Sequence, residues 1–378
     1  MMDAQVLLYY CYSQVADASV LASAQESLMR DLNLKGRVRV AREGINGTLA
    51  GAAQDLERYK RETERALESD DIDWKTSPVK AAANLVQEGQ DRTDDVFEGV
   101  LVKVVDNLVA AKGTRMGQGD YSPESTGVHL SPEDFHATIS AAAPEDIALI
   151  DVRNQYEYEV GHFRGAINPC TRKFSDFETW FVSEGARLVQ NKQKVLMYCT
   201  GGIRCETASI MVKEVLERNA VRENQDNQQH QLDEQQDRKQ ALPSRDSDCS
   251  ASKTPAVFQL KGGIHRYLEA FPEGHFAGRN FVFDGRILQP APGTGEKTVG
   301  KCAYCHGSWD THLEDRRCKK CRMLVLAYLQ KRRSSLEHRL SNLQGRGLSR
   351  QRRKVRAQLA ELDDAQMQLQ TLANVEVS

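Results

Sequence analysis

The chain is 378 residues long, more than a single ordinary hydrophobic core holds, so two or three domains are expected. Its 40% apolar and 28% charged residues are typical of a globular protein, and no run approaches the roughly 18 consecutive apolar residues of a membrane span. The net charge of -2 excludes a chain that is basic throughout, so any nucleic-acid binding has to depend on a local concentration of positive charge.

The start of the chain has no basic segment before its apolar run and no Arg-rich presequence, so a cytoplasmic location is expected. Nine cysteines are present, and four of them form one constellation, "CAYC…CKKC". In a reducing compartment this pattern indicates metal ligation more readily than disulfides.

Residues 1–112 predict an α+β domain of ferredoxin-like, or acylphosphatase-like, type. "QVLLYYCY" is typical of a strand, and "DASVLASAQESLMRDLNL" has helical spacing with Asp17 or Ser19 as N-cap. The helix "AQDLERYKRETERAL" and the strand "VLVKVVDNLVA" close a β-α-β-α-β order. The strand between the two helices, "GRVRVAREGINGTLAG", is expected to break at Gly44, Asn46 and Gly47.

A Gly/Ser/Pro-rich linker at 113–127 leads into a predicted α/β domain at 128–289. Its strands, "DIALIDVRN", "KVLMYC" and "AVFQLKGG", are almost continuously apolar and alternate with helices. That pattern predicts a parallel sheet covered on both faces, with ligands at the carboxyl ends of its strands. The polar tract at 219–255 buries too little apolar surface to fold and is predicted to be a disordered insertion.

The second of these strands ends at Cys199, which begins the stretch "CTGGIRCE". The loop Thr200, Gly201, Gly202 and Ile203 opens a predicted helix, so its N–H groups and the helix dipole point positive charge at the sulfur. Arg204 adds a permanent cation. A thiolate is therefore favoured, and Cys199 is the candidate nucleophile with Arg204 as its anion-binding partner. The alternative is an inert cysteine packed at a strand end.

The spacing of this loop distinguishes two chemistries. Cysteine phosphatases use Cys-x5-Arg, whereas here the interval from Cys199 to Arg204 is Cys-x4-Arg and resembles the rhodanese loop, which cradles a persulfide sulfur. Cys205 occupies the position of the phosphatase arginine. It either packs in the first helical turn or acts as a resolving thiol that forms a disulfide with Cys199.

The sequence resembles the rhodanese family beyond the loop. "LIDVRNQYEYEVGHFRGAINP" matches the rhodanese pattern "DVR…E…GH…GA", and "VFQLKGGIHRYLEAFP" matches its closing strand and helix. The resemblance implies that Asp151 and Arg153 orient neighbouring loops and that His162 packs structurally.

Three motifs, "REGINGT", "CTGGIRCE" and "FVFDGR", resemble one subgroup more narrowly. This subgroup consists of the rhodanese-domain tRNA uridine hydroxylases, which are called TrhO in bacteria. Their eukaryotic relatives are the thiosulfate sulfurtransferase/rhodanese-like domain-containing proteins. The resemblance covers roughly residues 5–325 and implies oxygen-dependent 5-hydroxylation of the wobble uridine of tRNA. It matches Cys199 to the essential cysteine and makes molecular oxygen the co-substrate.

The "EGING" motif is either a tight turn or part of a substrate site. Its polar side chains, taken to be exposed, make Arg42, Glu43 and Asn46 candidates for substrate binding. "FDGR" is likewise either a turn or a functional motif.

The segment 290–326 is expected to bind zinc. Its cysteines have zinc-ribbon spacing, Cys-x2-Cys-x12-Cys-x2-Cys, and two such pairs complete a closed, structural tetrahedron. The alternative is a set of reduced, unligated thiols. The predicted ligands are Cys302, Cys305, Cys318 and Cys321.

The tail 327–378 is predicted to form charged helices, two of them joined by a short break at Gly345 and Gly347. Between Arg322 and Arg356 there are 11 Lys or Arg against the single acid Glu337. The stretch is either a solvated helical face or an electrostatic footprint for tRNA.

The residues alone are compatible with three functions. The first is a tRNA uridine hydroxylase with Cys199 as its reactive centre. The second is a thiosulfate sulfurtransferase that works through a Cys199 persulfide, which the loop length fits equally well. The third is a non-catalytic RNA- or protein-binding module, against which the intact Cys199 loop argues.

Overall fold

The computed structural model describes most of the chain up to residue 290 and scattered positions after it. The described residues are 4–70, 72–79, 96–97, 99–110, 123–171, 173–237, 254–283, 288–290, 333, 336–337, 340–341, 352–353, 355–360 and 363. The chain forms two compact units, of which the first comprises Met1–Tyr158 and His162–Gly295 and the second comprises Glu159–Gly161 and Glu296–Ser378. In the described part of the chain, no helix has the length and apolarity that crossing a membrane requires.

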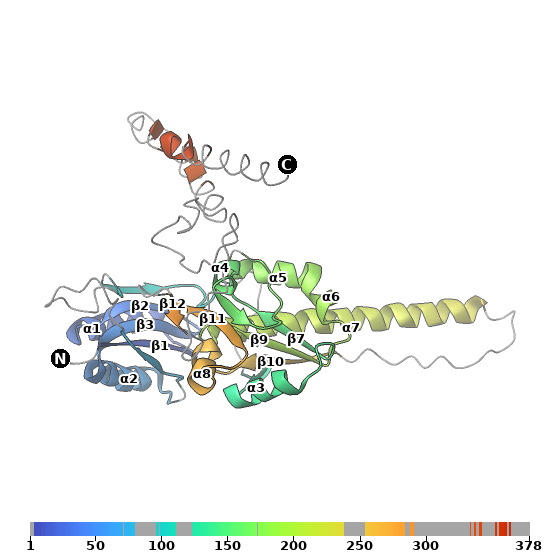
Figure 1. Ribbon diagram of the computed structural model, residues 1–378, viewed down its shortest axis with the longest axis horizontal. Helices are drawn as coiled ribbons and strands as arrows, with labels where there is room; N and C mark the ends of the chain where they lie inside the picture. The colour runs from blue at the N-terminus through green and yellow to red at the C-terminus, as the bar shows by residue number, and fades with distance from the viewer. Residues whose placement is uncertain are drawn as a thin grey trace. The chain divides into compact units, whose positions relative to one another are not determined.

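The N-terminal part of the first unit is a five-stranded sheet with the two predicted helices (Figure 1). Three strands were predicted; the middle one is the hairpin of two strands, and β4 is an additional strand. The strand order is β4-β1-β3-β2-β5, and its first four strands have the ferredoxin-like order. The elements are β1 (Ala4–Tyr12), α1 (Ala18–Asp31), β2 (Lys35–Ala41), β3 (Gly44–Ala52), α2 (Ala53–Leu67), β4 (Lys75–Pro78) and β5 (Val100–Val104). Strand β5 pairs parallel to β2, and the other pairs are antiparallel.

The two faces of this sheet differ because side chains alternate along each strand. Leu7, Tyr9 and Cys11 of β1 belong to the hydrophobic core together with residues of α1 and α2. The intervening residues of β1 point to the opposite face. At the start of α1, Asp17 is the N-cap, and its carboxylate accepts hydrogen bonds from the N–H groups of residues 19 and 20 at 2.8 and 3.1 Å.

The expected break at Gly44, Asn46 and Gly47 is wrong, because all three lie within β3. The turn of the β2–β3 hairpin is made by residues 42 and 43 instead. The two glycines allow close packing: a Cβ at Gly44 would lie 2.0 Å from the carbonyl oxygen of Cys11, and one at Gly47 would lie 2.4 Å from the ring of Tyr9. Gly44 also has a positive φ of 140°, whereas Gly47 does not have a positive φ.

The second half of the first unit has the predicted parallel sheet, with the three predicted strands and the additional strand β6 in the order β6-β10-β9-β7. A three-stranded sheet of order β12-β11-β8 lies beside it (Figure 1). The strands are β6 (Val128–Leu130), β7 (Ile147–Asp151), β8 (Gly161–Phe163), β9 (Lys194–Tyr198), β10 (Ala256–Leu260), β11 (Phe276–Phe281) and β12 (Leu288–Pro290). The helices are α3 (Pro132–Ala141), α4 (Gln155–Tyr158), α5 (Phe177–Trp180), α6 (Ala186–Val189), α7 (Ile203–Asp237) and α8 (Gly263–Ala270), with a π-helical turn at Phe181–Gly185.

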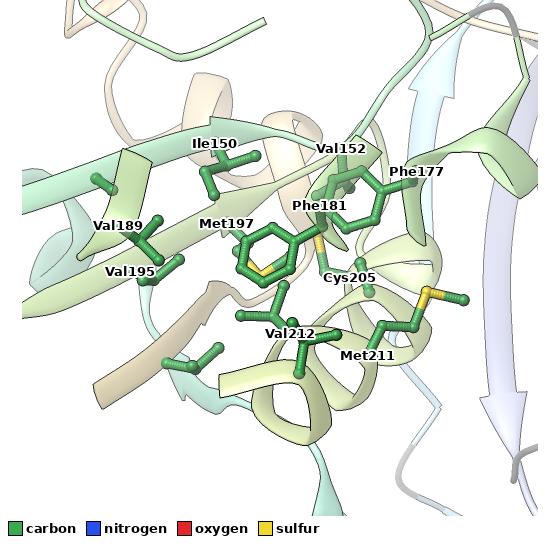
Figure 2. Packing of buried hydrophobic residues seen from close by; sticks show 14 of the residues in the cluster. Ile150, Val152, Phe177, Phe181, Val189, Val195, Met197, Cys205, Met211 and Val212 are labelled. Atoms are coloured by element: carbon green, nitrogen blue, oxygen red, sulfur yellow. The ribbon is translucent and has the colours of Figure 1, made fainter. Parts of the chain in front are cut away.

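Helices cover both faces of the parallel sheet. On one face, Phe177 and Phe181 pack with Met197 of β9 and Val212 of α7, and Cys205 lies in the same cluster (Figure 2). On the other face, residues of α3 and α8 pack with Leu149, Leu196 and Tyr198. Adjacent residues of β9 thus contribute to opposite cores, which is why its sequence is continuously apolar.

The expectation of a disordered insertion at 219–255 is wrong for residues 219–237, because α7 continues to Asp237. Residues 219–237 contain six Gln, which extend a helix readily once packing has formed its first turns. Residues 238–253 lie outside the described part. Of the linker expected at 113–127, the described residues are ordered by local contacts: Pro123–Ser125 is a 3-10 turn, and the N–H of Gly127 donates to Ser209 Oγ at 2.8 Å.

In the second unit, the described residues from 333 to 341 and from 352 to 363 are helical, as expected for two helices. Leu336 and Val355 are buried. Arg333 forms ion pairs with Glu337 and with Asp363. The described parts of the two helical segments therefore contact each other.

Candidate active site

Cys199 lies where the sequence places it, between the end of β9 and the start of α7. The N–H of Gly202 donates to Cys199 Sγ at 3.1 Å. Gly202 has a φ of +105°, a conformation that side chains rarely adopt, so glycine is required for the loop to turn its N–H toward the sulfur. The loop thus has the local geometry of an anion cradle.

The environment of Cys199 favours the thiolate, although the side chain is fully buried. Burial alone would raise the pKa of Cys199, but the hydrogen bond from the Cys205 thiol, the charge of Arg204 and two backbone N–H groups lower it to about 6. Burial and the neighbouring thiolate of Cys199 raise the pKa of Cys205 well above its ordinary value. Cys205 is therefore a neutral donor to Cys199, and it also packs in the core.

Arg204 does not point a free guanidinium at the loop. Both of its terminal nitrogens bond Glu157, with Nη1 to Oε2 at 2.7 Å and Nη2 to Oε1 at 2.8 Å. Glu157 is fully buried, and although burial alone would raise its pKa, Arg204 and Arg153 hold that pKa below its usual value. Arg204 therefore acts on the thiolate by its charge and by fixing the loop, which corrects the expectation that its side chain grips the anion.

Thr200 joins the loop to the same ion pair. Its hydroxyl lies 3.3 Å from Glu157 Oε1 and 3.4 Å from the carbonyl oxygen of Phe281, and it accepts from Arg204 Nη2 at 3.2 Å. Ile203 packs against the core cluster at the start of α7. These contacts hold both ends of the loop.

The N-terminus of α8 holds the carbonyl groups of the loop. The N–H of Ile264 donates to the carbonyl of Cys199 at 2.9 Å, and the N–H of His265 donates to that of Thr200 at 3.2 Å. Gly263 makes this approach possible: it has a φ of +65°, and a Cβ there would lie 2.6 Å from the Cys199 carbonyl oxygen. Because the loop carbonyls accept hydrogen bonds from α8, the backbone N–H groups of the loop can point toward the sulfur.

The remaining rhodanese motif residues are structural, as the resemblance implies. Arg153 and Asp151 are both fully buried and form an ion pair at 2.7 Å. The ring of His162 stacks on Tyr158, with centroids 3.8 Å apart, and its Nδ1 lies 2.8 Å from the Tyr158 carbonyl oxygen. None of these contacts reaches Cys199.

Side chains of β1 cover the Cys199 loop. Leu8 and Tyr10 lie against Gly201 and Gly202, where added Cβ atoms would meet them at 3.0 and 2.8 Å. The hydroxyl of Tyr10 donates to Glu206 Oε1 at 2.9 Å.

A buried cation lies beside this contact. Lys75 Nζ is 5.4 Å from the centre of the Tyr10 ring and pairs with Asp73 at 2.7 Å. Asp73 in turn pairs with Arg266 of α8 at 2.9 Å. The N-terminal sheet therefore contributes to the surroundings of the sulfur, which the sequence does not indicate.

The three candidate substrate residues of the hairpin are not brought together around Cys199. Arg42 is exposed, and Glu43, expected to be exposed, is buried, with its Oε1 accepting from the N–H of Leu108 at 2.6 Å. Burial raises the pKa of Glu43. Asn46 is half-buried and pairs in register with Tyr10. A substrate role for these residues stays a prediction.

The predicted zinc ligands, Cys302, Cys305, Cys318 and Cys321, lie outside the described residues, as do Asp284, Gly285 and Arg286 of the "FDGR" motif. Among the residues that are described, no group of three or more His, Cys, Asp or Glu has the geometry of a metal site. The zinc site therefore stays a prediction from spacing.

Comparison with known proteins identifies the family. The chain matches the acylphosphatase-like domain of UPF0176 over residues 4–108, the rhodanese-like domain over 131–270 and the rhodanase C-terminal domain over 277–336. A tRNA uridine(34) hydroxylase of Enterococcus faecalis is 37% identical over 305 residues, which cover 79% of this chain and 77% of that protein. The chain belongs to the tRNA uridine(34) hydroxylase family. The family resemblance, the predicted acylphosphatase-like α+β fold and the predicted rhodanese α/β fold are thereby confirmed.

Other members of the tRNA uridine(34) hydroxylase family and a plant protein match over similar lengths. The family member of Corynebacterium kroppenstedtii is 31% identical, with 80% of this chain and 84% of that protein covered. A rhodanese-like domain-containing protein 6 of Arabidopsis thaliana is 32% identical over 85% of this chain, and the chain spans about half (49%) of its length.

We expect the thiolate of this family member to titrate near pH 6. The difference in ultraviolet absorbance between the wild-type chain and a Cys199→Ala variant should show one thiolate with a midpoint at about pH 6. At pH 7 about nine in ten molecules would carry the charge, since one pH unit is a tenfold change. In Cys205→Ala the midpoint should rise, because the variant removes a hydrogen bond to the thiolate.

The titration of Cys199 should also appear in the pH dependence of the unfolding free energy. A depressed pKa means that the thiolate stabilises the folded state above the unfolded-state value of about 8.5, and that this contribution is lost as the pH falls through about 6. The wild-type chain should therefore lose more unfolding free energy than Cys199→Ala between these values. A midpoint near 8.5 would contradict the thiolate assignment.

Proposed function

We propose that this chain hydroxylates C5 of uridine 34, the wobble uridine of tRNA, with Cys199 as its reactive centre and molecular oxygen as co-substrate. The observation that supports this most directly is family membership: relatives that cover most of the chain at 30–37% identity are tRNA uridine(34) hydroxylases. The Cys199 loop supports it chemically, because it provides a thiolate at neutral pH.

The roles of the individual residues follow from their contacts. Cys199 supplies the reactive thiolate, and Gly202 holds it with a backbone N–H. Arg204 stabilises the negative charge from its ion pair with Glu157, and α8 fixes the orientation of the loop. Because Cys199 is fully buried beneath Leu8 and Tyr10, catalysis requires these side chains to move before a nucleoside reaches the sulfur.

Three further assignments are part of this proposal. The four C-terminal cysteines bind one structural zinc ion, the basic stretch 322–356 contacts tRNA, and the protein acts in the cytoplasm. The spacing of the cysteines and the local excess of Lys and Arg support the first two assignments. The reduced state expected of so many free thiols supports the third.

A sulfurtransferase activity is the second candidate, and the loop length favours it. Four residues between Cys199 and Arg204 suit a persulfide sulfur rather than a phosphate. In that reaction the Cys199 thiolate takes a sulfane sulfur from thiosulfate, sulfite leaves, and an acceptor then removes the sulfur.

Two assays separate these candidates. In cells lacking the gene, we expect 5-hydroxyuridine derivatives at position 34 to disappear from the nucleoside profile of total tRNA. The wild-type gene should restore them and Cys199→Ala should not. Unchanged nucleosides together with rapid thiocyanate formation from thiosulfate and cyanide would overturn hydroxylation in favour of sulfur transfer.

A further inference from the structure

The N-terminal sheet has a face that its own helices do not cover. On this face lie the residues of each strand that alternate with the core positions, and part of it is closed by Leu8, Tyr10 and Tyr12 against the Cys199 loop and α7. Val96 and Phe97 cover another part, beside Val6. The remaining part, over β2 and β5, is exposed.

The exposed part carries positive charge. Arg37 and Arg39 of β2 and Lys103 of β5 are all exposed. The two arginines alternate with buried residues of β2, whereas Lys103 lies between the half-buried Val102 and the exposed Val104. No acid among the described residues forms an ion pair with any of the three. Arg37 also lies over the ring of Phe97, 6.0 Å from its centre. Exposed cations that have no acidic partner among the described residues favour an anionic ligand.

The strand register connects this charge to Cys199. Tyr10 pairs with Asn46, Asn46 with Arg39, and Arg39 with Lys103, so these four residues form one row across four adjacent strands. At a strand spacing of about 4.8 Å, the row is roughly 14 Å long. Its inner end is Tyr10, whose hydroxyl lies against Gly202, the residue that bonds the Cys199 sulfur.

We propose that this row, Tyr10–Asn46–Arg39–Lys103, binds single-stranded RNA and leads one of its nucleotides to the Cys199 loop. The proposal rests on the proposed function, because uridine 34 lies in a single-stranded loop of tRNA. The guanidinium of Arg39 suits phosphate or a stacked base, the ammonium of Lys103 suits phosphate, and the amide of Asn46 suits a base edge. By analogy, RNA-recognition motifs bind RNA on the open face of a four-stranded sheet.

The test compares two double variants of the full-length chain. Arg39→Gln with Lys103→Gln removes two charges from the row, whereas Arg58→Gln with Arg61→Gln removes two exposed charges from α2, which packs on the other face of the sheet. Binding is measured by fluorescence anisotropy with a labelled anticodon stem-loop RNA, over a series of salt concentrations. All three proteins should have the same melting temperature, since the changed residues are exposed.

We expect the row variant to bind RNA about 10-fold more weakly at moderate salt. The slope of log K against log salt is negative, and it should become less steep by about 1.4, since each lost phosphate contact accounts for roughly 0.7. The α2 variant should stay within about twofold of the wild-type chain. Equal binding by the two variants would overturn the proposal, and so would equally tight binding of the wild-type chain to a duplex RNA of the same charge.

Product formation separates this proposal from the proposed function. If the wild-type chain hydroxylates the stem-loop and the row variant does so with an unchanged KM, the binding surface is wrong and the activity stands. If the wild-type chain binds the stem-loop through the row but yields no hydroxylated uridine with oxygen present, the activity is wrong and the binding surface stands.

Discussion

Replacing Glu157 with Gln should destabilise the protein by about 3–5 kcal/mol, because it removes one partner of a buried ion pair and leaves the charge of Arg204 uncompensated. Glu157 is fully buried and also accepts from the N–H of Asn154 at 3.1 Å. The glutamine keeps the shape of the side chain, so the loss is electrostatic. A fall in melting temperature on the order of 10 °C is expected for a fold of this size.

The matched control for this variant is Glu184→Gln, which removes the same charge at an exposed position of the same domain. Its unfolding free energy should stay within about 0.5 kcal/mol of the wild-type value. Urea unfolding of both variants provides the comparison. The coupling energy follows from Glu157→Gln, Arg204→Gln and the double variant that combines them. Identical urea midpoints for Glu157→Gln and Glu184→Gln would show that the ion pair does not hold the loop.

Much of this fold was predictable because its elements are long and amphipathic or continuously apolar. The helix at Ala53–Leu67 and the strand at Lys194–Tyr198 carry such patterns, and the structure places both where the sequence does. Strand β4 has only four residues, "KTSP", without an apolar alternation, so no periodicity reveals it. The hairpin turn was misplaced because the glycines of β3 serve its packing against β1, which the sequence of β3 alone does not show.

The candidate site likewise has a part that the sequence predicts and a part that it does not. The Cys199 loop is local in sequence, so its cysteine, glycines and following helix predict an anion cradle. The contacts that fix it are not local: Glu157 is 47 positions from Arg204, and Tyr10 is 196 positions from Glu206. The arginine was assigned to the anion because it directly follows the loop in sequence. Only the fold brings the carboxylate to it.

Gly263→Ala should lower both stability and activity by displacing the Cys199 loop. At φ +65° an alanine costs about 1–2 kcal/mol, and its Cβ would lie 2.6 and 2.7 Å from the carbonyl oxygens of Cys199 and Thr200. Those oxygens are backbone atoms, so the loop or α8 has to shift. The hydrogen bonds from Ile264 and His265 then weaken, at about 1 kcal/mol each. The total expected loss is roughly 3–4 kcal/mol.

Gly165→Ala separates backbone strain from loop displacement. Gly165 has a similar φ of +78°, but a Cβ there would meet nothing within 4 Å. Both variants should therefore show the cost of the positive φ, whereas only Gly263→Ala should raise the pKa of Cys199 above about 6 and reduce tRNA hydroxylation. If both variants keep the wild-type thiolate titration and activity, then α8 supports the fold without setting the geometry of the loop. A raised pKa in Gly263→Ala alone would mean that the orientation of the loop carbonyls, fixed by α8, is what leaves the backbone N–H groups free to stabilise the thiolate.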